Sequence, residues 1–224
     1  MYGYCPGQIA EISKRGGLSH RGYISEVNTI KYLWIGIFLV VLIWSGIDPK
    51  DPITWFLEVL PALIGAAILA ATYRRFKLTS ILYFLILAHC IVLMIGGHYT
   101  YAEVPFFNDL FGAERNNYDK LGHFFQGLVP ALIAREIFIR KHVVNGRRWL
   151  SLFVICVALS FSAFYELIEW WVAVMSGGGA EAFLGTQGYI WDTQSDMAFA
   201  LIGAISSLVF LSKFHENQIK NLVG

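Results

Sequence analysis

The stretch "WLSLFVICVALSFSAFYELIEWW", residues 149–171, decides the fold class, because it is long and apolar enough to cross a membrane as a helix. A transmembrane helix needs about 20 predominantly apolar residues to span the hydrocarbon core. Two glutamates, Glu166 and Glu169, nevertheless stand near the end of this run. A charged side chain at the bilayer centre costs about 2.5 kcal/mol or more, so we expect both glutamates to be shallow, paired, or both.

The composition of the whole chain points to the same class. Of its 224 residues, 56% are hydrophobic and 15% are charged, whereas about a quarter of the residues in a soluble domain are charged. The net charge of +1, with no strongly basic run, argues against a nucleic-acid partner. Cys90 and Cys156 lie in apolar runs and Cys5 lies near the N-terminus, so we expect neither a disulfide framework nor a thiolate metal site.

Hydropathy divides the chain into apolar segments of spanning length. They lie at about residues 29–47, 53–73, 78–97, 119–140, 149–174 and 193–212. The sequence therefore predicts an all-α, polytopic membrane protein with a bundle of six transmembrane helices. The predicted organisation is a polar N-terminal tail over 1–27, a transmembrane domain over 28–213 and a C-terminal tail over 214–224.

The distribution of lysine and arginine predicts the orientation. With alternating spans, three of the 17 basic residues fall on one side: Lys50, Arg115 and Lys120. The others fall on the opposite side: Lys14, Arg15, Arg21, Lys31, Arg74, Arg75, Lys77, Arg135, Arg140, Lys141, Arg147, Arg148, Lys213 and Lys220. Because cytoplasmic loops are enriched in lysine and arginine, both tails are predicted to be cytoplasmic. Residues 98–118 and 175–192 are then expected outside.

The glutamates of the opening stretch lie toward the predicted outer side. At about 1.5 Å per residue, Glu166 lies roughly 25 Å along the span that begins near Trp149, and Glu169 lies nearer 30 Å. The hydrocarbon core is about 30 Å thick, so both are shallow. Their spacing of three places them on one helix face. Trp170 and Trp171 fit the interfacial aromatic belt just beyond them.

Three other predicted helix ends bring ionisable residues to the same depth. "NNYDKLGHFFQG" opens one span and places Asp119 and His123 four residues apart, with Gln126 a turn deeper. "GYIWDTQSDM" opens another span. It supplies Asp192 and Asp196 with Gln194 between them, and "GGHYTYAEVPF" supplies His98 and Glu103. Facing helices of bundles build metal and proton sites from such pairs.

Each of these residues also has a purely structural interpretation. Shallow acids can sit in headgroup water, and acids in the first turn of a helix favour capping and the helix dipole. His123 could be a packing residue with a hydrogen bond. The single-residue interpretations do not predict paired acids with a histidine at one depth, so the pattern favours a functional polar site.

The strings "YDKLGHFFQG", "FYELIEWW" and "GTQGYIWDTQSDMAFALIGA" resemble the YjdF-like family of bacterial inner-membrane proteins. A more distant likeness is to the VanZ-like family, with its Asp-Lys…His, Glu-x-x-Gln and Asp…Asn…Gly motifs. Asp119, Lys120 and His123 match the first motif, Glu166 matches the second, and Asp196 and Gly203 match the third. Glu169 and Ala200 replace the glutamine and the asparagine, which makes the site more anionic. The resemblance implies a multi-pass inner-membrane protein with a polar site.

The candidate site supports three functional hypotheses. In the first, a metal-dependent enzyme acts on a lipid or cell-envelope precursor, with catalytic candidates Asp119, His123, Glu166, Glu169, Asp192 and Asp196. A zinc, manganese or magnesium ion would be held by His123, Glu166, Glu169 and Asp196. Further ligand-binding candidates are His98, Glu103, Lys120, Gln126 and Gln194. The alternatives are a proton- or cation-coupled transporter and a non-catalytic binding or scaffold protein. The expected partners are membrane lipids and a lipid-linked or small envelope substrate.

Overall fold

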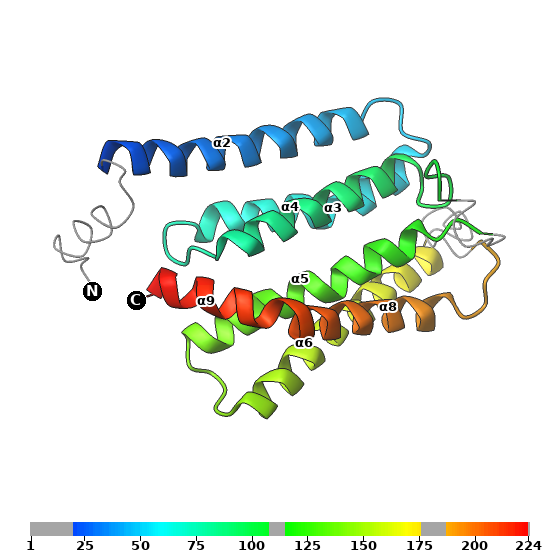
Figure 1. The fold of residues 1–224 in the computed structure, drawn as a ribbon. Helices are drawn as coiled ribbons and strands as arrows, with labels where there is room; N and C mark the ends of the chain where they lie inside the picture. The colour runs from blue at the N-terminus through cyan, green and yellow to red at the C-terminus, as the bar shows by residue number, and fades with distance from the viewer. Residues whose placement is uncertain (1–19, 108–114, 176–186, 224) are drawn as a thin grey trace. The chain divides into compact units, whose positions relative to one another are not determined.

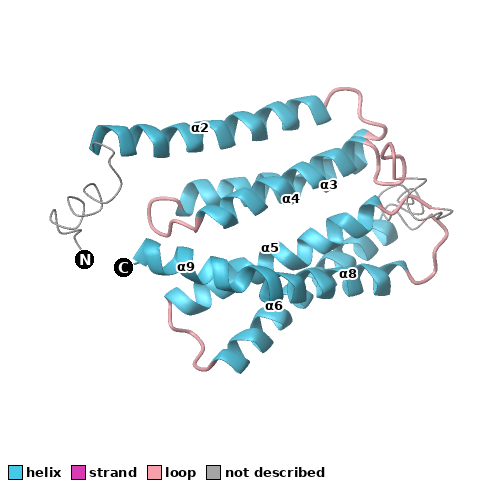
Figure 2. Cartoon of the chain, viewed as in Figure 1, coloured by secondary structure: helices cyan, strands magenta, loops and turns pink. Residues whose placement is uncertain are grey.

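The computed structural model describes residues 20–107, 115–175 and 187–223. Within these ranges every regular element is helical and there is no strand, as Figure 2 shows, so the all-α prediction is confirmed. The elements are α2 (His20–Ser45), α3 (Pro52–Thr72), α4 (Ser80–His98), α5 (Tyr118–Arg140), α6 (Arg147–Met175), α8 (Asp192–Ser206), the π-helix η2 (Ser207–Leu211) and α9 (Ser212–Val223).

Four helical stretches of the described chain are long and apolar enough to cross a membrane: Pro52–Thr72, Ser80–His98, Arg147–Met175 and the continuous run Asp192–Val223. The apolar part of α2, Ile30–Ser45, is shorter. α5 falls outside this group because its sequence carries many charged and polar residues, most of which are buried in the fold. The described chain therefore has four candidate membrane spans, and the count of six spans stays a prediction.

The chain forms two compact units, residues 1–41 and 42–224. In the described part of the first unit, α2 is the regular element. Within the second unit α5 is the central helix, because it packs most extensively against α8 and also contacts α6 and α4 (Figure 1). α3 in turn packs on α4. A helix in contact with three others has little surface left for lipid, which explains how α5 can carry so many polar residues.

Two glycines allow α5 and α8 to approach closely. A Cβ atom added at Gly127 would overlap the carbonyl of Ala200, and one added at Gly203 would overlap the carbonyl of Phe124. Small residues at such positions are typical of helix pairs in membranes, where close backbone contact supplies the packing energy. This contact fixes the relative position of the two helices that carry most of the candidate site.

Two helix boundaries differ from the sequence prediction. α2 already begins at His20, before the expected start near residue 29. The last helix does not end near residue 212; it continues through η2 and α9 to Val223. The reason lies in the packing of α9, whose residues His215 and Ile219 are buried.

A buried polar network lies where the C-terminal end of α5 meets α9. Its centre is Glu136, which is fully buried with His215. Glu136 Oε2 accepts hydrogen bonds from His215 Nε2 at 2.9 Å and Thr79 Oγ1 at 2.8 Å, and Oε1 pairs with Arg140 at 2.6 Å. Arg135 lies 3.4 Å from His215 Nδ1. Because a guanidinium group only donates, Nδ1 accepts and the proton of the neutral imidazole lies on Nε2.

Candidate carboxylate–histidine site

Three helix ends bring the predicted site residues together. The start of α5 supplies Asp119 and His123, the C-terminal part of α6 supplies Glu166 and Glu169, and the start of α8 supplies Asp192 and Asp196. Each of these six residues is at most 9% exposed. The i,i+3 and i,i+4 spacings seen in the sequence therefore correspond to inward-facing pairs.

The first of two neighbouring groups is the aspartate cluster, defined as Asp119, Asp192 and Asp196 with Lys120 and Arg115. Lys120 Nζ lies 2.6 Å from Asp196 Oδ1, 2.9 Å from Asp192 Oδ1 and 3.4 Å from Asp119 Oδ2. Arg115 adds contacts of 2.6 Å to Asp119 and 2.7 Å to Asp192. The ligand atoms of the three aspartates lie close enough to hold a metal ion. The Lys120 ammonium already pairs with all three aspartates and compensates their negative charge.

The segment that leads into α8 covers the aspartate cluster. The Tyr189 ring centre lies 5.3 Å from the Arg115 guanidinium carbon and 5.9 Å from Lys120 Nζ. Gln187 holds this segment through two hydrogen bonds of 2.9 Å with the backbone N–H and carbonyl of Asn116. Arg115 and Lys120 therefore contact an aromatic ring as well as carboxylates, and cation–π attraction adds to the pairing.

The second group is the histidine cluster, defined as His123, Glu166 and Asp196. Glu166 Oε1 lies 3.8 Å from His123 Nδ1, and Asp196 Oδ1 lies 3.7 Å from His123 Nε2. Gln126 Oε1 lies 2.9 Å from His123 Nδ1 and accepts a hydrogen bond from the Nδ1–H group, so the Nε2 lone pair is available. Side-chain ligand atoms of all three residues lie within 4.8 Å of one another.

Glu166 differs from the aspartates in having one oxygen without a partner, although Thr193 forms a hydrogen bond with its carboxyl group. Its Oε1 atom is buried and has no hydrogen-bond partner in the described structure. One turn away on α6, Ser162 Oγ is also buried without a partner there. Among the described residues, no lysine or arginine forms a salt bridge with Glu166 or Glu169. Buried carboxylates without a cation have to take up protons or a metal ion.

Sequence reasoning did not single out three residues around these clusters. Glu58 of α3 is 4% exposed and accepts a hydrogen bond of 3.0 Å from Tyr165, whose ring lies 6.4 Å from that of His123. Arg115 was treated only as a loop charge. Glu58 could have been recognised from the sequence, because an ionisable residue inside an apolar run is by default a candidate for a functional site. Tyr165 and Arg115 had no such signal.

Three other predicted ligand-binding residues have different surroundings. His98 Nδ1 lies 3.0 Å from the Ser45 carbonyl, and its ring packs on Trp44 with centroids 4.8 Å apart. Glu103 pairs at 2.8 Å with Lys50, and this exposed ion pair raises the pKa of the lysine. Gln194 points to the exposed side of α8. The predicted loop over residues 176–186 lies outside the described residues.

Comparison with known proteins places the chain in a family. Residues 30–217 match the family described as "Predicted membrane protein (DUF2238)". The chain is 54% identical over 184 residues to the inner membrane protein YjdF of Escherichia coli (strain K12), covering 81% of this chain and 88% of that protein. No solved structure matches. The distant VanZ-like likeness rests on the motifs alone. The match to most of its length shows that the chain belongs to the DUF2238 family of inner-membrane proteins.

Proposed function

We propose that this protein is a membrane-embedded metalloenzyme. The histidine cluster would bind one divalent cation, and the substrate would be a lipid headgroup or a lipid-linked precursor of the cell envelope. One observation carries the proposal: the Glu166 carboxylate is buried with an unpartnered oxygen, directed at a histidine and next to a second acid. Native structures rarely leave a buried polar atom unpaired without a functional reason.

The chemistry of the donor set supports this assignment. One imidazole and two carboxylates are the ligands that zinc, manganese and magnesium take in proteins. Three protein ligands would leave coordination positions open for water or substrate, as in catalytic sites. A cation held in this way supplies activated water and polarises a phosphoryl or carbonyl oxygen.

The geometry narrows the expected ligand set. Of the four residues expected from the sequence, His123, Glu166 and Asp196 meet the distance requirement together, whereas Glu169 is not part of that group. The aspartate cluster is a weaker candidate because Lys120 already compensates it. Asp196 belongs to the histidine cluster and also pairs with Lys120. The Lys120 ammonium therefore limits how far the Asp196 carboxylate can move. We assign Lys120 a positioning role.

The location of the site supports a substrate at the membrane surface. The site residues of α5 and α8 lie in the first two turns of their helices, and the ends of membrane-spanning helices lie near the lipid headgroups. Together with a six-span topology, the positive-inside rule favours cytoplasmic termini and a periplasmic site. Reporter fusions at residues 115 and 180 test this orientation. Activity of both reporters in the cytoplasm would contradict it.

The test of the metal site uses two matched glutamates. Glu166 and Glu169 are each 8% exposed, lie on one face of α6, and lose the same charge when changed to glutamine. We expect purified wild-type protein and Glu169→Gln to bind one equivalent of metal, and Glu166→Gln and His123→Ala to lose it. In the proteins that bind, a hundredfold excess of cation over its Kd should stabilise the fold by about 2.7 kcal/mol. Chelation should reverse the corresponding rise in Tm.

Two results would overturn the metalloenzyme proposal. The first is wild-type protein with no bound metal and no response to chelator, which would favour a proton-sharing or ligand-binding site. The second is equal metal loss in both glutamine variants, which would show that the total negative charge matters and not the three-residue geometry. A transporter would instead require Glu166→Gln to abolish ion flux in vesicles.

A further inference from the structure

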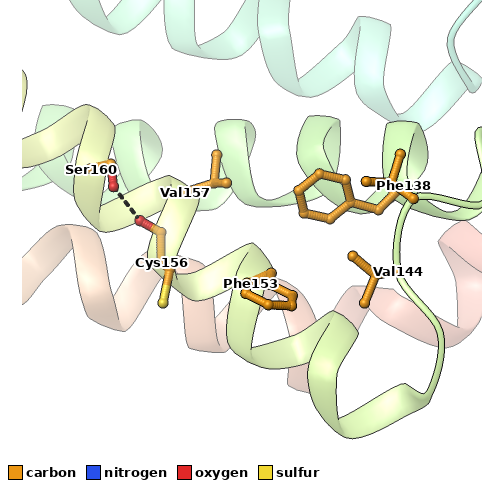
Figure 3. Close-up of a pocket in the computed structure, with 7 residues that line it drawn as sticks. Phe138, Val144, Phe153, Cys156, Val157 and Ser160 are labelled. Atoms are coloured by element: carbon orange, nitrogen blue, oxygen red, sulfur yellow. Dashed lines mark hydrogen bonds between the residues drawn. The ribbon is translucent and has the colours of Figure 1, made fainter.

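A separate groove lies near the end of the α5–α6 hairpin, remote along α5 from the histidine cluster. It has a volume of about 380 Å³, within the range of about 300–1,000 Å³ that is usual for small-molecule sites. The residues labelled in Figure 3 come from α5, the connecting loop and α6: Phe138, Val144, Phe153, Cys156, Val157 and Ser160. The Ser160 hydroxyl is used internally, since it donates to the Cys156 carbonyl at 2.8 Å. The groove therefore suits an apolar chain.

Two arginines follow the groove-lining loop in the sequence. The loop that supplies Val144 to the lining is followed directly by Arg147 and Arg148, both exposed. Within the described chain neither arginine forms a salt bridge, whereas Arg135 and Arg140 on α5 pair with Glu216 and Glu136. Guanidinium groups have the charge and the hydrogen-bond donors to bind a phosphate group.

We propose that this groove is a binding site for an anionic phospholipid. One acyl chain would lie along Phe138, Phe153 and Val157, and the headgroup phosphate would pair with Arg147 and Arg148. Basic residues at the edge of a membrane segment attract anionic lipids, and basic pockets between helices bind their headgroups. The exposed Trp149, at 58%, fits the interfacial level at which such a headgroup lies. This proposal does not depend on the metal site.

Cys156 provides the readout because it is exposed and lines the groove, whereas Cys90 is buried. In a Cys5→Ser background, maleimide labelling of Cys156 in detergent reports occupancy. We expect phosphatidylglycerol to slow the labelling at concentrations where phosphatidylcholine has little effect. Arg147→Gln/Arg148→Gln should weaken the phosphatidylglycerol effect about thirtyfold, from the loss of two basic residues near a headgroup.

The exposed pair Arg74 and Arg75 in the α3–α4 connection provides a matched control, because its double glutamine variant loses the same charge and neither residue lines the groove. This control should keep the wild-type response. Native mass spectrometry of each variant counts bound lipid and checks that the protein is folded. Equal protection by both lipids, or equal loss in both double variants, would overturn the proposal. Protection without lipid that increases with protein concentration would also overturn it, since a second copy of the chain would then cover the groove.

Discussion

A buried glutamate lies beside a histidine at each end of α5. The two glutamates differ in whether all their oxygen atoms have hydrogen-bond partners. At the C-terminal end, Glu136 and His215 are fully buried and the carboxylate has partners on both oxygens. At the N-terminal end, His123 lies beside Glu166, which has a buried oxygen without a partner in the described structure. Complete networks hold a structure together, whereas an incomplete one is where a ligand can contribute. This difference is the reason for proposing a structural network at one end and a binding site at the other.

Both ends depend on the same pair of chain segments. α5 and the final helical run supply Lys120 with Asp196 at one end and Glu136 with His215 at the other. The close contact at Gly127 and Gly203 lies between them along α5 and α8. A complete network at one end can therefore help to hold the helices in register for the incomplete one.

The largest expected effect is on the complete network. Glu136→Gln removes the charge that pairs with Arg140 and His215, and leaves buried partners uncompensated. Breaking a buried ion pair in this way costs about 3–5 kcal/mol. We expect a corresponding fall in the stability of the purified protein, measured by thermal or denaturant unfolding in detergent.

Glu216→Gln is the control for this comparison. Glu216 also pairs with Arg135 and Lys220, but its side chain is 46% exposed. Exposed pairs contribute about 0–1 kcal/mol, so the variant should remain close to wild type. Equal stability losses in the two variants would contradict the distinction between a buried network and a surface pair.

In the histidine cluster, replacing the glutamate should raise the stability of the protein instead of lowering it. In metal-free protein at pH 8, Glu166→Gln removes a buried carboxyl group that must either take up a proton or stay charged without a lysine or arginine partner in the described chain. We expect this variant to be more stable than wild type by about 1 kcal/mol, because an unpaired buried polar group is costly. Unfolding in the presence of chelator measures the change. A loss of stability as large as that of Glu136→Gln would show that Glu166 is a structural residue.

The sequence was sufficient to predict the helical class and the meeting of acids from several helix ends, because hydropathy and 3.6-residue spacing are local signals. It could not show that Lys120 pairs with three aspartates, or that one oxygen of Glu166 has no partner in the described structure. Both depend on how α5, α6 and α8 pack. The pairing of Glu136 with His215 was equally hidden. It requires the last helix to continue beyond residue 212, and a span of ordinary length had been expected to end there.

The smallest expected effect concerns an acid whose function is purely local. Asp51 Oδ1 accepts a hydrogen bond of 2.6 Å from the Thr54 N–H and caps α3, and this bond lowers the pKa of the carboxyl group. Asp119 and Asp192 lie in first turns too, but the capping positions of their helices are Asn117 and Trp191. Capping therefore accounts for Asp51 and not for the aspartate cluster.

Asp51→Ala should lower stability by about 1 kcal/mol at pH 7 without changing metal content, because it removes only the cap. A carboxyl group with a lowered folded-state pKa stabilises the protein above its unfolded pKa of about 3.9, and this contribution is lost as the pH falls through the folded-state value. The difference between wild type and Asp51→Ala should therefore shrink below about pH 4. Asp51→Asn retains an N-cap acceptor and should stay near wild type at pH 7, with no such pH dependence at this position. Loss of metal in Asp51→Ala would show that this acid belongs with the candidate site after all.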